Sequence, residues 1–391
     1  MDHNVMLVEG NRLMLEKLSN TIRETDGFSL AVRYQDVSEA LGQGGMFHPD
    51  LILLDVEQSG ARETLVEFRR VFRETPIICI GERWEAETAS RLVQEGALGY
   101  LIKPFTSEEL QSAWDTFSKS GMETNSQIIS FFSTKGKSGK TTLIANLALV
   151  LARMTGEQIG VIDADLQFGD MALMLNLEPQ TTIVEAVRDA EFLSPLSLSK
   201  YFLPVNDSVH VLCGTPYPNL SDKVEIQPFE EIVRMAKSLF RYILIDMPPG
   251  FCPISISAAE LSNYTYVIAM ENQGYEIRHV QRALEIFKDW EDYQKRVHVI
   301  FTRVNPQNTQ MTNEIQYLLE YPVDSFIPNE YLEVSQAADE GRSMLDLDPN
   351  GEYTRCVQLI AEQIINPIKR TAEDFDFSSR VTSDDIDDDL L

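Results

Sequence analysis

Residues 128–151 read IISFFSTKGKSGKTTLIANLALVL. An apolar run of strand length leads into a short turn containing Gly136 and Gly139, and a long apolar stretch of helical character follows. Backbone N–H groups of such a turn, together with the first turn of the helix, favour an anion. Lys140 can contact phosphate oxygens and Thr141 can ligate Mg²⁺ through its hydroxyl. The segment therefore predicts a phosphate-binding loop between a strand and a helix.

Two later apolar runs end in aspartate. QIGVID (158–163) ends at Asp163, with Asp165 two residues further on, and YILIDM (242–247) carries Asp246 just before Pro-Pro-Gly. A carboxylate at the tip of a buried strand beside a phosphate loop can hold the water shell of Mg²⁺. Each aspartate alone would be a helix cap or a residue in a solvated turn. The phosphate loop and the two strand-end aspartate segments, in this order, together indicate a site for ATP with Mg²⁺.

Apolar runs alternate with helical patterns along most of the chain, which predicts an α/β fold with mostly parallel sheets covered on both faces. A length of 391 residues favours two domains, each with three layers. The expected strands are VMLV (5–8), LILLDV (51–56), PIICI (76–80), GYLI (99–102), IISFFS (128–133), QIGVID (158–163), VHVLCG (209–214), YILIDM (242–247), YVIAM (266–270) and VHVIFT (297–302). The expected domains are 1–118 and 128–370.

Two polar segments lie outside these domains. The small polar residues 119–127 predict a linker, and residues 371–391 are strongly acidic, so we expect disorder there. The formal net charge of -28 repels bulk DNA and anionic lipid, so no specific nucleic acid is expected as a partner. Scattered cysteines, the lack of a signal peptide pattern and the lack of a long apolar run favour a cytoplasmic protein with no direct membrane insertion.

The phosphate loop resembles the deviant Walker A loop of the ParA/MinD group of P-loop ATPases, which reads K-G-G-x-G-K-T-T. The resemblance covers about residues 128–368 and implies ATP and Mg²⁺ as cofactors. The residues it places around the nucleotide are Lys135, Gly136, Lys137, Ser138, Gly139, Lys140, Thr141 and Thr142.

The same resemblance implies roles for the acidic residues. Asp165 matches the aspartate that positions the attacking water. Asp163 and Asp246 match the acidic residues around Mg²⁺, and Thr141 is the third candidate metal residue.

Lys135 matches the signature lysine that reaches across a dimer interface to the partner's nucleotide, so the resemblance implies a homodimer. Lys135 and Asp165 are thus the catalytic candidates. FTRVNP and FIPNEYLEVSQAADEGRSM look like the base-binding end of the group, with Asn305 and Pro328 near the adenine.

One loop position departs from the group. Lys137 stands where the group has its second glycine. If this residue needs a positive φ, lysine costs about 1 kcal/mol or more there. We therefore expect ATP binding with weak or slow hydrolysis.

Residues 4–117 resemble the receiver domain of response regulators, which is flavodoxin-like in fold. Asp55 in LILLDV matches the phosphoacceptor, and Lys103 followed by Pro104 in GALGYLIKPF matches the lysine–proline corner. The acidic pair after the first strand is reduced to Glu9 followed by a glycine, and Gly81 replaces the switch hydroxyl. Fewer anionic ligands weaken Mg²⁺ binding. The domain is expected to be a degenerate docking or dimerisation module, and phosphorylation of Asp55 stays open.

A degenerate receiver ahead of a ParA/MinD-type ATPase resembles the TadZ/CpaE family. The resemblance implies a nucleotide-dependent dimeric switch that positions the tight-adherence (Flp-type) pilus or secretion machinery. Its implied partners are a pilus or secretion ATPase and inner-membrane assembly components, with recruitment to a cell pole or to the inner-membrane face.

Other functions stay open on the sequence. A partitioning ATPase acting on DNA would need a basic surface. A membrane-cycling ATPase would need an amphipathic helix, whereas this chain ends in DDIDDDLL. A response regulator with an ATPase as its output would need complete receiver chemistry.

Overall fold

The computed structural model describes residues 2–57, 61–73, 75–120, 125–271, 274–290, 292–367, 370 and 372–375. The chain divides into two compact units. The first comprises Met1–Ser126, Phe192–Lys200 and Arg234–Leu239, and the second comprises Gln127–Glu191, Tyr201–Val233 and Phe240–Leu391. The domain limits 1–118 and 128–370 stay predictions. Most of the acidic segment expected to be disordered, 371–391, lies outside the described residues.

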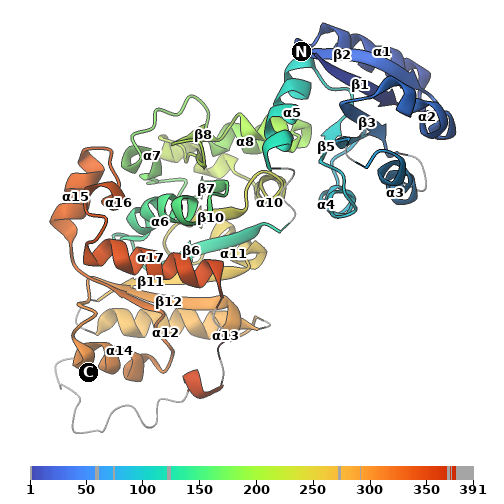
Figure 1. Cartoon of the computed structure of the whole chain (residues 1–391). Coiled ribbons are helices and arrows are strands. Elements are labelled where there is room, and N and C mark those ends of the chain that lie inside the picture. The colour runs from blue at the N-terminus through green and yellow to red at the C-terminus, as the bar shows by residue number, and fades with distance from the viewer. Residues whose placement is uncertain are drawn as a thin grey trace. The chain divides into compact units, whose positions relative to one another are not determined.

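The first unit contains a parallel sheet of five strands in the order β2-β1-β3-β4-β5, with helices on its faces (Figure 1). Its inner strands are apolar on both faces because helices cover both sides. The elements are β1 His3–Val8, α1 Arg12–Glu24, β2 Phe28–Tyr34, α2 Val37–Gln43, η1 Gly44–Phe47, β3 Leu51–Asp55, α3 Ala61–Val71, β4 Ile77–Gly81, α4 Ala86–Gln94, β5 Gly99–Ile102 and α5 Ser107–Ser120.

The rest of the described chain builds an eight-stranded sheet in the order β13-β12-β11-β6-β10-β7-β9-β8. All its pairings are parallel except that of β8 with β9. The strands are β6 Gln127–Phe132, β7 Ile159–Asp163, β8 Leu203–Pro204, β9 Val209–Leu212, β10 Tyr242–Asp246, β11 Tyr264–Met270, β12 Val297–Thr302 and β13 Ser325–Ile327. The predicted α/β class is confirmed.

The helices after β6 are mostly short. They are α6 Lys140–Thr155, α7 Met171–Met174, α8 Ile183–Asp189, η2 Ala190–Phe192, α9 Pro195–Ser199, η3 Pro218–Lys223, α10 Ile226–Ala236, α11 Pro253–Leu261, α12 Tyr275–Phe287, α13 Tyr293–Arg296, α14 Thr309–Leu319, α15 Tyr331–Asp339, α16 Met344–Leu347, α17 Glu352–Ile365 and η4 Ala372–Phe375. Among the described residues, no helix has the length and apolarity that a membrane crossing needs.

Helix α6 is apolar on almost all sides because it is packed between the sheet and other helices. It contacts β10 and β7 on the sheet, and α7, α16 and α17 elsewhere (Figure 1). Leu147 and Ala148 in its middle are completely buried. Such all-round burial fixes the helix, and its first residue, Lys140, follows directly on the phosphate loop.

Strand pairing brings three distant segments to one edge of the sheet. In the ladder of β10 with β7, Asp246 is paired with Asp163, and in the ladder of β10 with β6 it is paired with Phe131. Because the strands are parallel, their carboxyl ends meet at this edge. The phosphate loop leaves β6 there, so the loop and both carboxylates converge.

Every strand expected from an apolar run is present, but β2, β8 and β13 were not expected. Strand β2, FSLAVRY, is an edge strand whose five central residues are only partly buried. It therefore lacks the continuous apolar run of an inner strand. Helix α5 also continues to Ser120, inside the segment expected to be a linker, of which residues 121–124 are not described.

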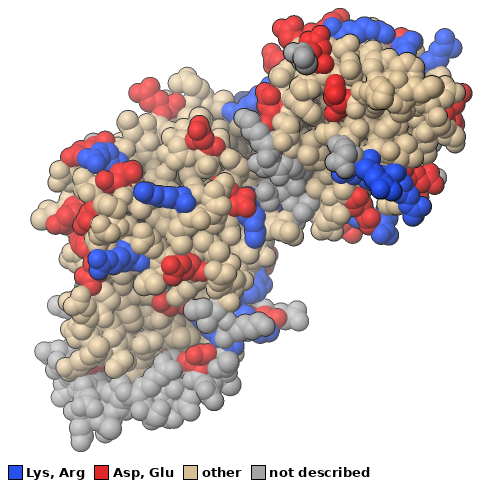
Figure 2. All heavy atoms as spheres, in the orientation of Figure 1, with Lys and Arg blue, Asp and Glu red and all other residues tan. Residues whose placement is uncertain are grey.

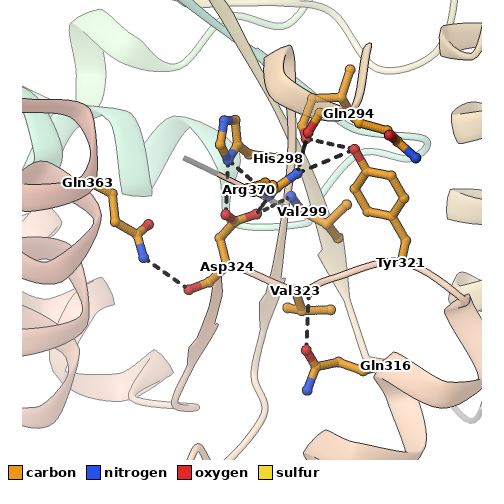
Figure 3. Close-up of polar contacts among 10 residues, drawn as sticks. Gln294, His298, Val299, Gln316, Tyr321, Val323, Asp324, Gln363 and Arg370 are labelled. Carbon is orange, nitrogen blue, oxygen red and sulfur yellow. Dashed lines mark hydrogen bonds and ion pairs between the residues drawn. The ribbon is translucent and has the colours of Figure 1, made fainter. Parts of the chain in front are cut away.

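A polar cluster holds Arg370 against the start of β12 (Figure 3). Oδ1 of Asp324 lies 2.9 Å from Nδ1 of His298, and Oδ2 of Asp324 lies 2.5 Å from Nη2 of Arg370. Nη1 of Arg370 donates to the hydroxyl of Tyr321 at 3.4 Å. Burial alone would raise the pKa of Asp324, but the His298 hydrogen bond and the Arg370 guanidinium outweigh it and lower this pKa. Phe375 packs edge-on against Tyr321, so the cluster ties the segment after α17 to the sheet.

Candidate functional site

The phosphate loop follows β6 and has two residues in the left-handed region. Gly139 has φ 84° and Lys137 has φ 67°. The lysine that departs from the K-G-G pattern thus occupies a backbone conformation that favours glycine. The side chain of Lys137 is exposed, so the cost comes from its backbone and not from crowding.

Asp246 at the end of β10 joins two residues of the loop. Its Oδ1 pairs with the ammonium of Lys140, and its Oδ2 accepts the hydroxyl proton of Thr141 at 2.6 Å. Asp246 is completely buried and Lys140 is 6% exposed, so solvent screens this ion pair little. The structure thereby brings together the lysine predicted to contact phosphate and two of the residues predicted to hold a metal.

Asp163 lies beside this pair and is also buried. Burial raises its pKa well above the usual aspartate value, the Asp246 carboxylate adds to the rise, and Lys140 opposes it. Two glycines make room for the carboxylate. A Cβ on Gly169 would lie 2.4 Å from Oδ2 of Asp163, and one on Gly214 would lie 3.1 Å from it. These glycines were missed as site residues, although Gly214 ends the predicted strand 209–214 and Gly169 follows the predicted strand 158–163.

Asp165 is held less tightly. Its Oδ1 accepts backbone N–H groups of Gln167 and Phe168 at 3.4 and 3.2 Å, and its side chain is partly buried. Asp165 lines the same pocket as the phosphate loop. This position leaves its second oxygen available to a polar group in the pocket.

A pocket of about 1540 Å³ opens over the loop. Its lining includes the phosphate loop from Gly136 to Thr142, together with Pro328. Asn305 is not part of this lining; it is exposed, and its Oδ1 accepts the N–H of Gln307 at 2.9 Å. The structure therefore brings Pro328 to the pocket and leaves Asn305 outside it.

Among the pocket residues that the sequence did not single out, two are in contact with each other. Arg303, with φ 63°, and Tyr331 both line the pocket, and the guanidinium carbon of Arg303 lies 5.7 Å from the centre of the Tyr331 ring. Arg303 is the second residue before Asn305 in the FTRVNP motif. Its positive φ turns the chain directly after β12, a change of direction that residue spacing does not reveal.

Lys135 also lies outside the pocket lining. Its Nζ is 3.2 Å from Oε2 of Glu276, which is on α12. The other carboxylate oxygen, Oε1, accepts the hydroxyl proton of Thr134. Glu276 was not a candidate in the sequence, since no motif marks it.

The donor set fits Mg²⁺ held together with a nucleotide. Among the described residues, no group of three or more His, Cys, Asp or Glu side chains forms a metal cage. Mg²⁺ in phosphate sites takes one or two carboxylates and completes its shell with water and phosphate oxygens. Thr141, Asp246 and Asp163 would supply such a partial shell beside the phosphate loop, although the two aspartates are buried and are not part of the pocket lining.

The first unit holds a second cluster of charged residues. Nζ of Lys103 lies 2.8 Å from Oε2 of Glu9 and 2.7 Å from Oδ1 of Asp55. Burial raises the pKa of Glu9, and the hydrogen bond from Lys103 opposes this rise. The three residues expected from the motifs thus meet at the carboxyl ends of β1, β3 and β5.

Gly81, at the end of β4, faces the hydroxyl of Tyr100. A Cβ at position 81 would lie 1.8 Å from that oxygen. The hydroxyl donates to the carbonyl of Arg83 at 3.1 Å, and the ring packs edge-on against Trp84. The tyrosine therefore occupies the space that a side chain at position 81 would take.

Comparisons with known proteins cover both units. The response regulator receiver domain model matches residues 5–115, and the NUBPL iron-transfer P-loop NTPase model of the ParA family matches residues 124–293. The solved structure of a ParA family ATPase from Chlorobium tepidum superposes with a TM-score of 0.56 at 18% identity, covering 60% of this chain and 98% of that one. The septum site-determining protein MinD of Pyrococcus horikoshii, complexed with Mg-ADP, gives 0.52 at 20% identity, covering 62% and 96%.

The chain joins a receiver-like domain to a ParA/MinD-like P-loop domain. In sequence, the P-loop domain is 26% identical over 250 residues to an uncharacterized ATP-binding protein of Methanocaldococcus jannaschii, which covers 61% of this chain and 87% of that protein. The receiver domain is 34% identical over 112 residues to the transcriptional regulatory protein MalR of Bacillus subtilis. That match covers 28% of this chain and 48% of MalR, so the chain spans about half the length of that regulator.

Proposed function

We propose that the protein is a nucleotide-dependent dimeric switch that binds ATP with Mg²⁺. The observation that carries the proposal is the contact of Asp246 with both Lys140 and Thr141, two loop residues that line the pocket. One carboxylate there links the phosphate-binding cation to the metal-binding hydroxyl. Similarity of the P-loop domain to MinD complexed with Mg-ADP supports this ligand.

Each residue of the site has a part in binding. Backbone N–H groups from Gly136 to Thr142 surround the phosphates, and the N-terminus of α6 favours their charge. Lys140 turns from Asp246 to the phosphates, which frees that carboxylate to hold Mg²⁺ with Thr141. When bound there, Mg²⁺ would supply charge neutralisation for the phosphates. Burial and the Asp246 carboxylate raise the pKa of Asp163, and a cation held there would favour its ionised form.

Hydrolysis is expected to be slow. Asp165 orients water at the pocket wall, while the left-handed conformation of Lys137 strains the loop that cradles the phosphates. A strained loop holds the nucleotide less uniformly than the K-G-G form does, and a small misplacement of reacting groups lowers the rate strongly. The lifetime of the dimer then depends more on binding than on turnover.

Dimerisation carries the switch. Lys135 of each subunit contacts the phosphates bound by its partner, so the dimer forms on ATP and presents a surface that the monomer lacks. A ligand shifts such an equilibrium only through its different affinity for the two states. The receiver domain acts as a docking or dimerisation module, because Lys103 occupies both Glu9 and Asp55 and Gly81 carries no hydroxyl.

The biological role that we propose is TadZ/CpaE-like. The switch positions pilus or secretion machinery of the tight-adherence type, recruiting its ATPase and inner-membrane components to a cell pole or to the inner-membrane face. Support comes from the pairing of a receiver domain with a P-loop domain and from similarity to the septum site-determining protein MinD of Synechocystis. That protein is 26% identical over 211 residues, covering 52% of this chain and 76% of MinD.

The test measures ATP binding and molecular mass together. The full-length protein is titrated with ATP and Mg²⁺, and its mass is followed by analytical ultracentrifugation. Lys140→Ala should abolish binding, and Lys135→Ala should bind ATP but stay monomeric. Lys295→Ala is the matched control, since Lys295 is an exposed lysine paired with Asp292. Absence of ATP binding by the wild type, or a dimer that ignores ATP and both loop lysines, would contradict the switch.

The proposed location is tested in cells that assemble such pili. A fluorescent fusion should form foci at the assembly site that Lys140→Ala disperses. Pilus assembly should fall with the same variant and not with Lys295→Ala. Foci on the nucleoid instead would favour a partitioning ATPase.

A further inference from the structure

Glu276 is a buried carboxylate that no motif marks. It lies in the first turn of α12, and its side chain is 7% exposed. Its Oε1 accepts the hydroxyl proton of Thr134, and its Oε2 lies 3.2 Å from Nζ of Lys135. These partners begin the phosphate loop, more than a hundred residues earlier in the chain. A separate helix therefore holds the first residues of the loop.

The position of the carboxylate is fixed by its helix. Ile277 and Val280 on α12 are buried, which fixes the orientation of the helix on the domain. The N-terminus of a helix favours a negative charge, and a buried carboxylate needs polar partners. Thr134 and Lys135 supply these partners. Glu276 is thus held in place whether or not the lysine stays.

The lysine of this pair is free to move. Its side chain is 52% exposed, in contrast to that of Glu276. Nδ1 of His279 lies 3.4 Å from the same Oε2 that Lys135 contacts. When the lysine leaves, the carboxylate keeps the Thr134 hydroxyl on one oxygen and the imidazole on the other. Departure of Lys135 therefore does not leave the buried acid without partners.

The contact with Glu276 holds the side chain of Lys135 outside the pocket. Nζ of Lys135 binds the side of α12, and Lys135 is absent from the lining of the pocket, whereas its neighbours from Gly136 onward line it. A lysine side chain that leaves Glu276 for the phosphates of another subunit gives up this ion pair. The two partners therefore compete for it.

We propose that Glu276 is a positioning residue that retains Lys135 within its own subunit until the nucleotide of the partner subunit displaces it. This inference rests on the proposed function, in which Lys135 crosses the dimer interface. The retained state is the monomer, and the released state is competent to dimerise. Because only the released fraction can dimerise, retention of the lysine lowers the apparent affinity of the subunits for each other.

The size of the effect follows from the exposure of the lysine. A partly exposed ion pair of this kind biases an equilibrium by about two- to five-fold. Both subunits must release their lysine, so the two factors multiply. Glu276→Gln keeps an oxygen for Thr134 and removes the charge. The dissociation constant of the ATP-bound dimer should therefore fall by about 4- to 25-fold.

The experiment has two measurements on the full-length chain. Trace acetylation of the nucleotide-free protein, read by mass spectrometry, reports the reactivity of Lys135 against Lys295 as an internal reference. Analytical ultracentrifugation with ATP and Mg²⁺ reports the dimer. Glu285→Gln is the matched control, because Glu285 is an exposed glutamate on the same helix, paired with Lys288. Thermal melting checks that Glu276→Gln is folded.

Each outcome decides a separate point. Faster acetylation of Lys135 in Glu276→Gln, with a tighter ATP dimer and no change in Glu285→Gln, supports the retention. Faster acetylation with an unchanged dimer overturns the retention and leaves the switch standing. Unchanged acetylation, or a weaker dimer, also overturns it. If the wild type does not dimerise on ATP, the switch itself fails, and the acetylation result still shows whether the contact exists.

Discussion

Replacing Lys137 by glycine should stabilise the P-loop domain. Lys137 has φ 67°, in the left-handed region, where an L-residue costs about 1–2 kcal/mol. Glycine removes that cost but adds about 0.5–1 kcal/mol of chain entropy to the unfolded state. The side chain is exposed, so truncation loses little packing. The expected net gain is about 0.5–1 kcal/mol relative to an alanine at the same position.

The assay compares Lys137→Gly with Lys137→Ala. Both variants lose the ammonium group, so their difference in stability reports the relieved backbone strain less the entropy that glycine adds to the unfolded chain. A domain of this size should melt about 2–4 °C higher for each 1 kcal/mol. Thermal melting of the nucleotide-free proteins measures this shift. A glycine variant that melts at or below the alanine variant would refute the assignment of strain to position 137.

The same pair separates strain from charge in nucleotide binding. Lys137 lines the pocket, so both variants should bind ATP more weakly than the wild type, and by a similar factor. If strain slows hydrolysis, the glycine variant alone should turn over faster. Steady-state phosphate release measures this, and equal turnover in both variants would remove the strain from the explanation of slow hydrolysis.

Three further changes test the buried groups. Asp163→Asn should raise the melting temperature of the nucleotide-free protein at neutral pH and abolish Mg²⁺-dependent ATP binding. Because the pKa of Asp163 is raised in the folded protein, the wild type loses stability as pH rises through that pKa. The difference in melting temperature between Asp163→Asn and the wild type should therefore vanish near pH 4 and grow above it. A difference that does not change with pH would contradict this. Arg370→Ala leaves Asp324 buried without its guanidinium partner and should lower the free energy of unfolding by about 3 kcal/mol. Adding Asp324→Asn to the same chain should restore part of this stability. Chemical denaturation measures both effects. Gly81→Ser should destabilise the receiver domain by about 1–3 kcal/mol, because the serine Cβ would meet the hydroxyl of Tyr100. Removing that hydroxyl with Tyr100→Phe should recover part of the lost stability. An unchanged melting temperature of Gly81→Ser would show that the tyrosine moves freely.

The sequence was sufficient for the sheets and for the centre of each site. Inner strands of a parallel sheet are apolar on both faces, so LILLD and YILID could be recognised from hydrophobicity alone. The carboxyl ends of such strands meet, and this rule already places Asp55 with Lys103, and Asp246 with the phosphate loop. It was not sufficient for β2, whose edge position leaves it half exposed and without a continuous apolar run.

Only the tertiary structure decided which distant side chains complete these sites. Glu276 reaches Thr134 and Lys135 from α12, and Arg303 enters the pocket in place of Asn305 because its positive φ turns the chain after β12. Local sequence determines hydrogen bonding along the backbone and the faces that are buried. The meeting of Glu276 with the phosphate loop depends on how α12 packs on the sheet. That packing is set by the summed burial of many side chains, and no short motif records it.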